Sequence, residues 1–363
     1  MFFLLLSISL INLITGAASP SDTGEATLIF VGDAMQHQAQ LDVAKEIGKD
    51  HYDYSDCFTL ISPELLDSDY AVCNLEVPLG GGPSYSGYPC FSAPDSYAEE
   101  LRDAGFNLMV TANNHCLDRS DKAARRTLLA LDSLGIDHTG TFHDRAQRDS
   151  LVPLIKDING FKIGFLNYTY GTNGILPKEG TEIALIEKDK MAKEIQKTKD
   201  KGAEIIIVAM HWGIEYVLLP NKIQKELADF LVDNGVDLVI GSHPHVIQPM
   251  ELKHNDKYDK DYLVVYSLGN FISNMKTADT RGGALVKVSL KRDENGKAYL
   301  NSANYDTFFV SKPYDGHNFR VIPLWSEVKL PEQQQTHRNL FERSAEKIFS
   351  TYNVNVSRLH KRN

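Results

Sequence analysis

The stretch Val236-Asp237-Leu238-Val239-Ile240-Gly241-Ser242-His243-Pro244-His245 joins a short apolar run to two histidines that flank a proline. An apolar run of this length, without polar alternation, is typical of a strand buried on both faces. The residue before a proline favours an extended backbone, in which alternate side chains point to the same side. We therefore expect a buried strand whose end presents two imidazoles together.

Runs of the same kind recur along the chain and alternate with segments of helical periodicity. Strand, helix and strand in succession are typical of layered α/β architecture. The expected strands cover residues 26–31, 70–73, 108–110, 162–166, 205–210, 236–240 and 262–266. The expected helices cover residues 121–134 and 223–232, together with the charged amphipathic stretch 182–201.

Several of these strands end in side chains that bind metals or move protons. Because the carboxyl ends of strands in an open α/β sheet share one edge, we expect these groups to converge on one crevice. The side chains at these strand ends are Asp33 and His37; Asn74 and Glu76; Asn113, Asn114, His115 and Asp118; His211 and Glu215; and His243 and His245.

The chemistry of this set indicates divalent metal ions. Carboxylates, an amide oxygen and imidazoles, with no thiolate, suit Mn, Fe or Zn. Two such ions, about 3.5 to 4 Å apart, need a bridging carboxylate and separate ligands on each side. We therefore predict a site for two divalent metal ions.

Each residue taken alone also has an ordinary structural explanation. An aspartate directly after a strand, such as Asp33, is often a helix cap, and a lone histidine such as His37 is more often an ordinary surface or core residue. Asn113 and Asn114 suit a turn, and His211 suits a buried imidazole with one hydrogen bond. The metal site is favoured because so many strand ends carry ligand chemistry together.

Composition excludes several classes of protein. The chain has 363 residues, of which 42% are apolar, and a formal charge of -10. Disorder is incompatible with this apolar fraction, and the negative charge argues against general binding to nucleic acid. No linker divides the chain, so we expect one domain over residues 25–310. A C-terminal extension follows over residues 311–363, with a terminal helix at 332–352 that packs on the domain or reaches a partner.

The N-terminus indicates export. The first 21 residues carry no charged side chain, and an apolar run is followed by the small residues of positions 15–20. We interpret residues 1–19 as a signal peptide, although a buried first helix is the alternative. The protein is then expected in the periplasm or cell envelope, with membrane contact only through the uncleaved segment.

Four cysteines, Cys57, Cys73, Cys90 and Cys116, lie in one part of the chain. An exported protein can oxidise them to disulfides, and the sequence does not choose among the possible pairings. Small buried hydrophobic residues are the equally acceptable alternative. No Cys-x-x-Cys spacing is present, which argues against a thiolate zinc site.

Six ordered motifs resemble the bacterial capsule-synthesis CapA family of the calcineurin-like metallophosphoesterase superfamily, which is linked to poly-gamma-glutamate production. They are GDAM at 32–35, NLE at 74–76, NNHCLD at 113–118, HWGIEY at 211–216, GSHPHVIQ at 241–248 and YSLGNF at 266–271. The resemblance implies an α/β fold, a four-layer α-β-β-α sandwich of the metallophosphoesterase type, with two metals at one edge.

The resemblance also implies roles for individual residues. Asp33 and Asn114 become metal ligands, His211 and His243 hold one metal, and His245 holds the other. His115 protonates the leaving oxygen as the catalytic acid. Glu76 stands where the superfamily has a bridging Asp, with Asn74 as its rival.

The first motif departs from the superfamily pattern. Met35 occupies the position at which the superfamily commonly has a histidine, and the nearest histidine is His37. Either His37 reaches the metal from the following turn, or that metal has one protein ligand fewer.

Other residues near the motifs are candidates for substrate binding: Glu215, Tyr170, Asn270 and Arg281. The function that the resemblance implies is metal-dependent hydrolysis of a phosphoester or another anionic group of an envelope polymer. The alternative is a component of the capsule-synthesis machinery that binds a growing anionic polymer without turnover.

Overall fold

A nine-stranded sheet carries the first expected strands. The computed structural model describes residues 24–360. The strand order is β16-β15-β14-β1-β2-β3-β4, with β13 paired to β1 and β17 to β15. The strands are β1 (Glu25–Ala34), β2 (Tyr70–Leu75), β3 (Phe106–Val110), β4 (Asp137–Thr139), β13 (Asn270–Ile272), β14 (Gly282–Arg292), β15 (Ala298–Val310), β16 (Val321–Pro323) and β17 (Ser357–Arg358).

A six-stranded sheet of order β11-β12-β10-β9-β7-β6 packs against it. Its central strands are parallel, and its edge strands β6 and β11 are antiparallel to their neighbours. The strands are β6 (Leu154–Ile158), β7 (Phe161–Thr169), β9 (Ile205–His211), β10 (Leu238–Ser242), β11 (Met250–Asn255) and β12 (Lys260–Val265).

Apolar side chains from both sheets form one central core. Leu28 and Val72 of the larger sheet belong to the same buried cluster as Phe165, Ile207 and Leu238 of the smaller one. Solidly apolar strands therefore bury both faces, as their lack of alternation predicts.

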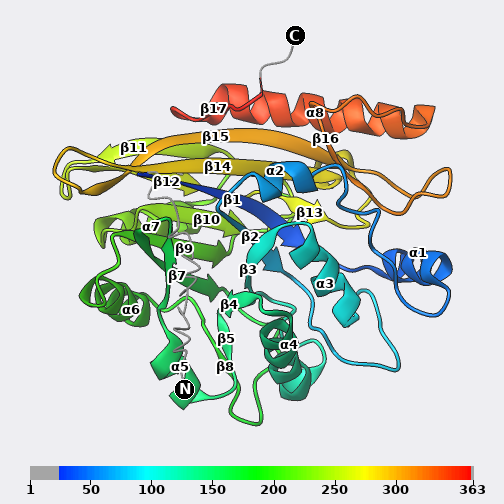
Figure 1. Ribbon diagram of the computed structural model, residues 1–363, viewed down its shortest axis with the longest axis horizontal. Coiled ribbons are helices and arrows are strands. Elements are labelled where there is room, and N and C mark those ends of the chain that lie inside the picture. Colours follow the sequence, from blue (N-terminus) through cyan, green and yellow to red (C-terminus); the bar gives the residue numbers. More distant parts are fainter. Residues whose placement is uncertain (1–23, 361–363) are drawn as a thin grey trace, which may run out of the picture.

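Helices cover the outer faces of the two sheets. Helices α2, α3 and α4 contribute to the core outside the larger sheet, and α6 and α7 to the core outside the smaller one. Figure 1 shows α3 and α4 on one side and α6 and α7 on the other. The expected four-layer α-β-β-α sandwich is confirmed. The helices so far are α1 (Gln38–Gly48), α2 (Ser62–Leu66), α3 (Asp95–Asp103), α4 (Ser120–Leu134), α5 (Arg145–Leu151), α6 (Lys188–Asp200), α7 (Lys222–Asp233) and the 3-10 helix η1 (Ala278–Thr280).

The expected helix over residues 182–201 begins later than predicted. Glu182 and Ile183 form strand β8 (Glu182–Ile183), which pairs with β5 (Thr141–Phe142). Ile183 is buried in this small sheet, so its apolar side chain belongs to a strand pair and not to the face of α6. The pattern of charges located the helix but not its first residue.

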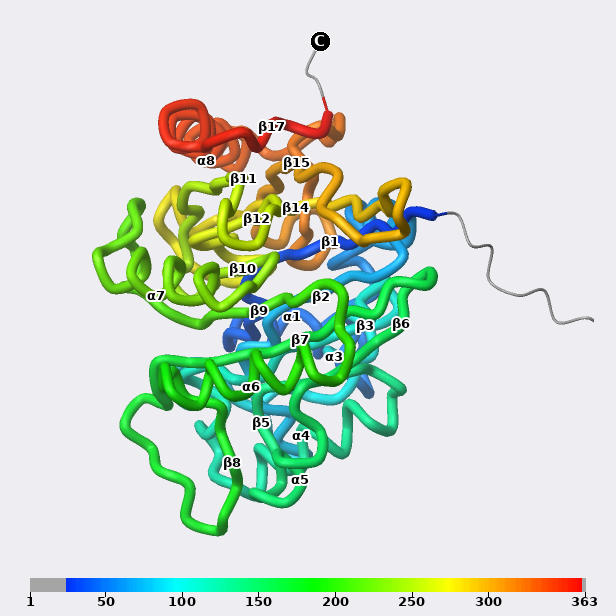
Figure 2. The backbone as a smooth tube through the Cα atoms, turned by 90° about the vertical axis from the view of Figure 1, so that its left-hand side faces the viewer, coloured from blue at the N-terminus to red at the C-terminus, as the bar shows by residue number. Residues whose placement is uncertain are grey.

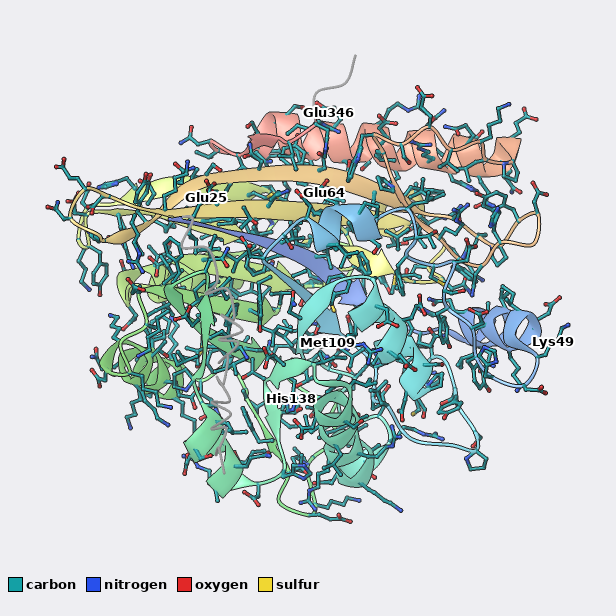
Figure 3. The ribbon with its side chains drawn as sticks, in the orientation of Figure 1. Glu25, Lys49, Glu64, Met109, His138 and Glu346 are labelled. Carbon is teal, nitrogen blue, oxygen red and sulfur yellow. The ribbon has the colours of Figure 1, made fainter. Side chains whose placement is uncertain are left out.

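The chain beyond residue 310 is part of the sandwich. Strands β16 and β17 both pair with β15, and helix α8 (Glu332–Tyr352) lies along β15 (Figures 1 and 2). Phe341 and Phe349 of α8 join the central core. On α8, Glu346, labelled in Figure 3, pairs with Arg358 of β17 at 2.7 Å. Of the two roles considered for the terminal helix, the structure shows packing on the domain.

The four cysteine thiols are free. Cys57, Cys73 and Cys116 are buried, whereas Cys90 is exposed. Burial raises the pKa of Cys57 and Cys73, and it raises that of Cys116 to about 12. These three residues act as small buried hydrophobes in the structure.

Two expectations concern the membrane. The signal peptide expected at residues 1–19 lies outside the described residues. Within residues 24–360, no helix combines the length and the apolar character needed to cross a bilayer.

Candidate metal centre

The nine-stranded sheet supplies oxygen donors at the carboxyl ends of β1 and β2. Asp33 of β1 lies opposite Asn74 of β2 in the strand register. The Asn74 Nδ2 group donates to Asp33 Oδ1 at 2.8 Å and to Glu76 Oε2 at 3.4 Å. Both carboxylates are fully buried, so Asn74 holds two acidic side chains together away from water.

Glycine is required where these strands approach the rest of the site. A Cβ on Gly32 would lie 1.8 Å from the Gly269 carbonyl oxygen, and one on Gly241 would lie 2.1 Å from that of Tyr266. Any larger residue would push the neighbouring chain away. This explains why Gly precedes both Asp33 and the His243 turn.

The six-stranded sheet supplies imidazoles. His211, the last residue of β9, lies opposite Ser242 of β10. Its Nδ1 atom is 2.9 Å from Ser242 Oγ, and its Nε2 atom is 2.8 Å from Asn114 Oδ1. Asn114 follows β3 of the other sheet, so the two sheets meet at His211.

His243 and His245 both face the site, but not through the extended backbone that we expected. Their φ angles are 96° and 57°, so both residues adopt left-handed conformations on either side of Pro244. Such conformations are costly for residues other than glycine and concentrate at functional sites. The ring centroids lie 5.9 Å apart, so the imidazoles are presented together as predicted, by a tight turn.

These side chains form two groups that share one carboxylate. Asp33, Glu76 and His211 place one ligand atom each within 4.8 Å of one another. Glu76, His243 and His245 form a second group by the same criterion. Glu76 is therefore the carboxylate common to both groups, and Asn74 lies beside it, with its side-chain amide hydrogen-bonded to Glu76 and Asp33.

Unpartnered buried atoms test whether ions fit. Glu76 Oε1 and His243 Nδ1 are buried and have no hydrogen-bond partner among the described residues. Glu76 Oε1 lies 3.6 Å from His211 Nε2 and 3.8 Å from His245 Nε2. These distances exceed a hydrogen bond but are close to the roughly 3.4 Å between two ligands bound tetrahedrally at about 2.1 Å. The donor set fits divalent cations.

The electrostatics of the cluster also suit cations. Burial, and then the charge of Asp33, raises the pKa of Glu76 well above its ordinary value. Burial, and then the charge of His243, lowers the pKa of His211, and burial lowers that of His243 to about 3. Burial alone would raise the pKa of Asp33, but His245 and other partners bring it below its ordinary value. The imidazoles of His211 and His243 are thus neutral, as metal binding requires, and a bound cation would favour ionised Glu76.

The grouping differs in one respect from that implied by the resemblance. His243 is grouped with His245, whereas the resemblance pairs it with His211. The His211 and His243 ring centroids are 4.8 Å apart, so both pairings are within reach. Asn114 lies on the His211 side in either case.

His37 lies beside the cluster but in neither group. It is the N-cap of α1, and its Nδ1 atom accepts from the Asn274 backbone N–H at 3.3 Å. Burial lowers the pKa of His37 to about 4. Of the two alternatives that the first motif left open, this position favours the ion with one protein ligand fewer.

His115 is oriented by a buried carboxylate. Its Nδ1 atom lies 2.8 Å from Asp118 Oδ2, which also accepts from the Phe91 backbone N–H at 2.8 Å. The Phe91 ring packs edge-on against the imidazole, with centroids 4.7 Å apart. Because Nδ1 is occupied, Nε2 is the atom left to exchange a proton with a substrate.

Comparison with known proteins gives the family. The model described as "Bacterial capsule synthesis protein PGA_cap" matches residues 27–275, a span that contains every member of the metal cluster. The chain belongs to this capsule-synthesis family.

Relatives in the family are similar over most of this chain. "Capsule biosynthesis protein CapA" of Bacillus anthracis is 30% identical over 285 residues, which covers 76% of this chain and 66% of that protein. "PGA biosynthesis protein CapA" of Bacillus subtilis is 28% identical over 299 residues, with 81% and 73% covered. Among solved structures, the NAD nucleotidase of Haemophilus influenzae matches with a TM-score of 0.45 at 10% identity, covering 91% of this chain and 64% of that one.

The structure of this family member brings some expected substrate residues to the site and not others. Tyr170 is half exposed, with its ring centroid 4.6 Å from that of His243, and Glu215 is half-buried four residues after His211. Asn270 is fully buried, and its Oδ1 atom lies 3.0 Å from His245 Nδ1, so it orients that imidazole. Arg281 is also buried and contacts His337 and Gln334 of α8, because the C-terminal helix covers it.

Sequence reasoning did not predict three supporting contacts within the site. Asn74 joins the two carboxylates, Ser242 fixes one His211 nitrogen and Asp118 orients His115. Asp118 had a signal, because it stands three residues after a histidine on the same turn. Ser242 had none, since its contact depends on the register between β9 and β10.

Proposed function

We propose that this capsule-synthesis family member is an exported, metal-dependent hydrolase of an envelope phosphoester or another anionic polymer group. Two divalent ions, Mn, Fe or Zn, would be held by Asp33, Asn114 and His211 on one side and by His243 and His245 on the other. The observation that carries the proposal is the buried Glu76 carboxylate shared between two groups of ligands, with one oxygen unpartnered.

The residues of the site have separate roles in this reaction. When bound, two divalent ions supply Lewis acidity and a nucleophile at neutral pH. His115 donates a proton to the leaving oxygen, and Asp118 keeps the imidazole in the orientation that exposes Nε2. Proton transfer of this kind contributes roughly a hundred- to ten-thousand-fold to rate.

A second candidate function is assembly without turnover. It is favoured by the names of the relatives, both of which are described as biosynthesis proteins. In that case the metal centre binds an anionic group of a growing polymer and hydrolyses nothing.

Metal content and turnover, measured together, separate the two functions. We expect purified protein to bind two ions and to hydrolyse p-nitrophenyl phosphate with Mn, Zn or Fe. Asp33→Asn and His243→Ala should lose metal and activity. His115→Gln should retain metal and lose activity about a hundred- to ten-thousand-fold. The matched control is His254→Ala, because His254 is an exposed histidine paired with Asp261.

Two outcomes would contradict the hydrolase. Metal binding without turnover of phosphoesters would favour the assembly function. Unchanged metal content in Asp33→Asn and His243→Ala would overturn the proposed centre altogether.

A further inference from the structure

A cavity of about 250 Å³ lies between the loop that joins β2 to α3 and the first turns of α4. The charged side chains that line it are all basic, namely Arg119, Lys122 and Arg126, and no carboxylate of the described residues is among its lining groups. A water molecule takes about 30 Å³ in the liquid, so the cavity has room for a small oxyanion with its waters. A cleft lined by one sign of charge concentrates ions of the opposite sign.

Two of these three cations have no partner in the fold. Arg119 and Lys122 are exposed, and within residues 24–360 neither makes an ion pair or a side-chain hydrogen bond. Arg126 is half-buried, pairs with Asp95 and donates from Nη1 to the Leu79 carbonyl at 2.9 Å. Arg126 is therefore fixed in place, whereas Arg119 and Lys122 keep their full charge for a ligand.

Ser92 adds a buried polar group to the same cavity. The residue is only 2% exposed, and its Oγ atom makes no hydrogen bond with any other described residue. Its backbone N–H donates to the Ser86 carbonyl at 2.8 Å and its carbonyl accepts from the Ser86 N–H at 3.1 Å, so the backbone is held on both sides. A buried hydroxyl without a protein partner costs free energy unless water or a ligand completes it. Ser92 thus indicates a ligand independently of the exposed cations.

Two glycines keep the space in front of these groups open. A Cβ on Gly80 would lie 2.3 Å from Ser92 Oγ, and one on Gly81 would lie 2.9 Å from Arg126 Nε. Both glycines line the cavity. A side chain at either position would fill the space that the hydroxyl and the guanidinium face.

The first turn of α4 forms the other wall of the cavity. Ser120 and Ala123 of this turn line it, and the N-terminal end of a helix favours anions. Asp121 lies in the same turn, but its carboxylate accepts from the backbone N–H groups of Lys178 and Glu179 at 3.0 and 3.1 Å. Asp121 is therefore occupied elsewhere and is not a lining residue.

The cavity begins one residue away from the contact that orients the catalytic acid. Ser92 follows Phe91, and Arg119 follows Asp118. The Phe91 backbone N–H donates to Asp118 Oδ2 at 2.8 Å, and the same oxygen lies 2.8 Å from His115 Nδ1. No member of either metal-ligand group lines the cavity, so it is a separate site.

We propose that this cavity binds a phosphate or carboxylate group of the anionic polymer, separately from the metal centre. Arg119 and Lys122 pair with the oxyanion, and the Ser92 hydroxyl donates to it. The inference goes beyond the proposed function, because it holds whether the metal centre hydrolyses the polymer or only binds it.

Polymer binding to the metal-loaded protein tests the cavity. The probes are fluorescently labelled polyphosphate and poly-L-glutamate, and the measurement is fluorescence anisotropy. We expect Arg119→Gln combined with Lys122→Gln to weaken the binding of at least one polymer about tenfold. Ser92→Ala should weaken it about two- to tenfold with no change in charge. Metal content should stay at two ions in both variants, because none of these residues belongs to a ligand group.

A second double variant controls for the loss of two positive charges. Lys193 on α6 and Lys347 on α8 are exposed and lie outside the cavity. Lys193→Gln combined with Lys347→Gln should leave both affinities unchanged. Equal weakening in the two double variants, or wild-type affinity for both polymers in the Arg119 and Lys122 variant, would overturn the site.

A protein without metal separates this inference from the hydrolase. Asp33→Asn, which we expect to lose metal, should retain the part of polymer binding that depends on Arg119 and Lys122. Loss of all polymer binding together with metal would overturn the second site. If wild-type protein binds a polymer through the cavity but hydrolyses nothing, the proposed function fails and this inference stands.

Inorganic phosphate distinguishes a polymer from a free ion. Calorimetric titration of Asp33→Asn measures its binding to the cavity without the metal centre. Binding of inorganic phosphate that depends on Arg119 and Lys122, with no binding of either polymer, would assign the cavity to free phosphate and overturn the polymer site.

Discussion

The two sheets contribute different atoms to the candidate metal centre. The nine-stranded sheet and its loops provide oxygen donors from Asp33, Glu76 and Asn114, whereas the six-stranded sheet provides imidazole nitrogens. Each ligand group contains members from both sheets. Neither sheet alone holds a complete group. Ions bound at this edge, where the two sheets meet, would therefore join the sheets as well as perform chemistry.

The two sides are also held in place by different means. On the oxygen side, amide side chains fix the carboxylates, because Asn74 donates to Asp33 and Asn113 donates to Asn74. On the nitrogen side, left-handed backbone at His243 and His245 sets the direction of the rings. The oxygen side thus depends on hydrogen bonds and the nitrogen side on a strained turn.

The largest effect should come from the one residue that both ligand groups share. Glu76→Gln keeps the shape of the side chain but removes the charge that would bridge two ions. We expect metal content to fall from two ions to fewer than one, and turnover of p-nitrophenyl phosphate to fall by roughly a thousandfold or more. Metal analysis and kinetics measure both.

Glu226→Gln, on the exposed face of α7, is the matched control and should change neither quantity. If Glu76→Gln bound two ions with wild-type turnover, the carboxylate would not bridge. The two ions would then be held by the other ligands of each sheet, without a shared carboxylate.

A smaller effect is expected on stability when metal is removed. A ligand present at a thousandfold excess over its Kd stabilises the folded state by about 4 kcal/mol. Chelation should therefore lower the Tm by roughly 5 °C or more, measured by calorimetry. An unchanged Tm would show that the ions do not clamp the two sheets.

Once metal has been removed by chelation, the stability of the protein should depend on pH in opposite ways for the nitrogen side and the oxygen side. The folded-state pKa of His243 is lowered to about 3, so its neutral form is retained while the unfolded state takes up a proton below about pH 6.5. Its contribution to stability is therefore lost as pH falls from 6.5 toward 3. Glu76 acts in the opposite sense, because its pKa is raised and its contribution is lost as pH rises above about 4.5.

A single substitution separates these two opposite slopes of the free energy of unfolding against pH. In metal-free protein, the free energy of unfolding by denaturant should fall less on acidification from pH 6.5 in His243→Ala than in wild type. Each such imidazole steepens the slope by at most about 1.4 kcal/mol per pH unit. A slope identical to wild type would mean that His243 is not kept neutral by the fold.

The sequence predicted which strand ends meet at the site better than it predicted the backbone geometry of the site. Apolar runs located the strands because burial on both faces leaves a simple pattern, and parallel strands place their ends on one edge. The left-handed turn at His243 was not predicted, since the preference before proline is for extended backbone. Arg281 was assigned to substrate because the sequence does not show that α8 covers it.

The smallest predicted effect concerns the bracing of the oxygen-donating sheet away from the site. Arg281, the residue between η1 and β14, contacts His337 Nδ1 at 2.6 Å and donates to the Val310 carbonyl at 3.3 Å, and burial lowers its pKa to about 10. Arg281→Lys removes this fork, so we expect a loss of about 1–3 kcal/mol in the free energy of unfolding by denaturant.

Metal content and the KM for p-nitrophenyl phosphate should stay near wild type in Arg281→Lys, because the guanidinium contacts His337 and Gln334 of α8 and no member of either ligand group. Arg343→Lys, on the exposed side of α8, is the matched control and should not change stability. A rise in KM with unchanged stability would instead show that Arg281 binds the substrate, as the sequence predicted. The two sheets would then differ in substrate contacts as well as in ligand atoms, with a cationic contact on the oxygen side.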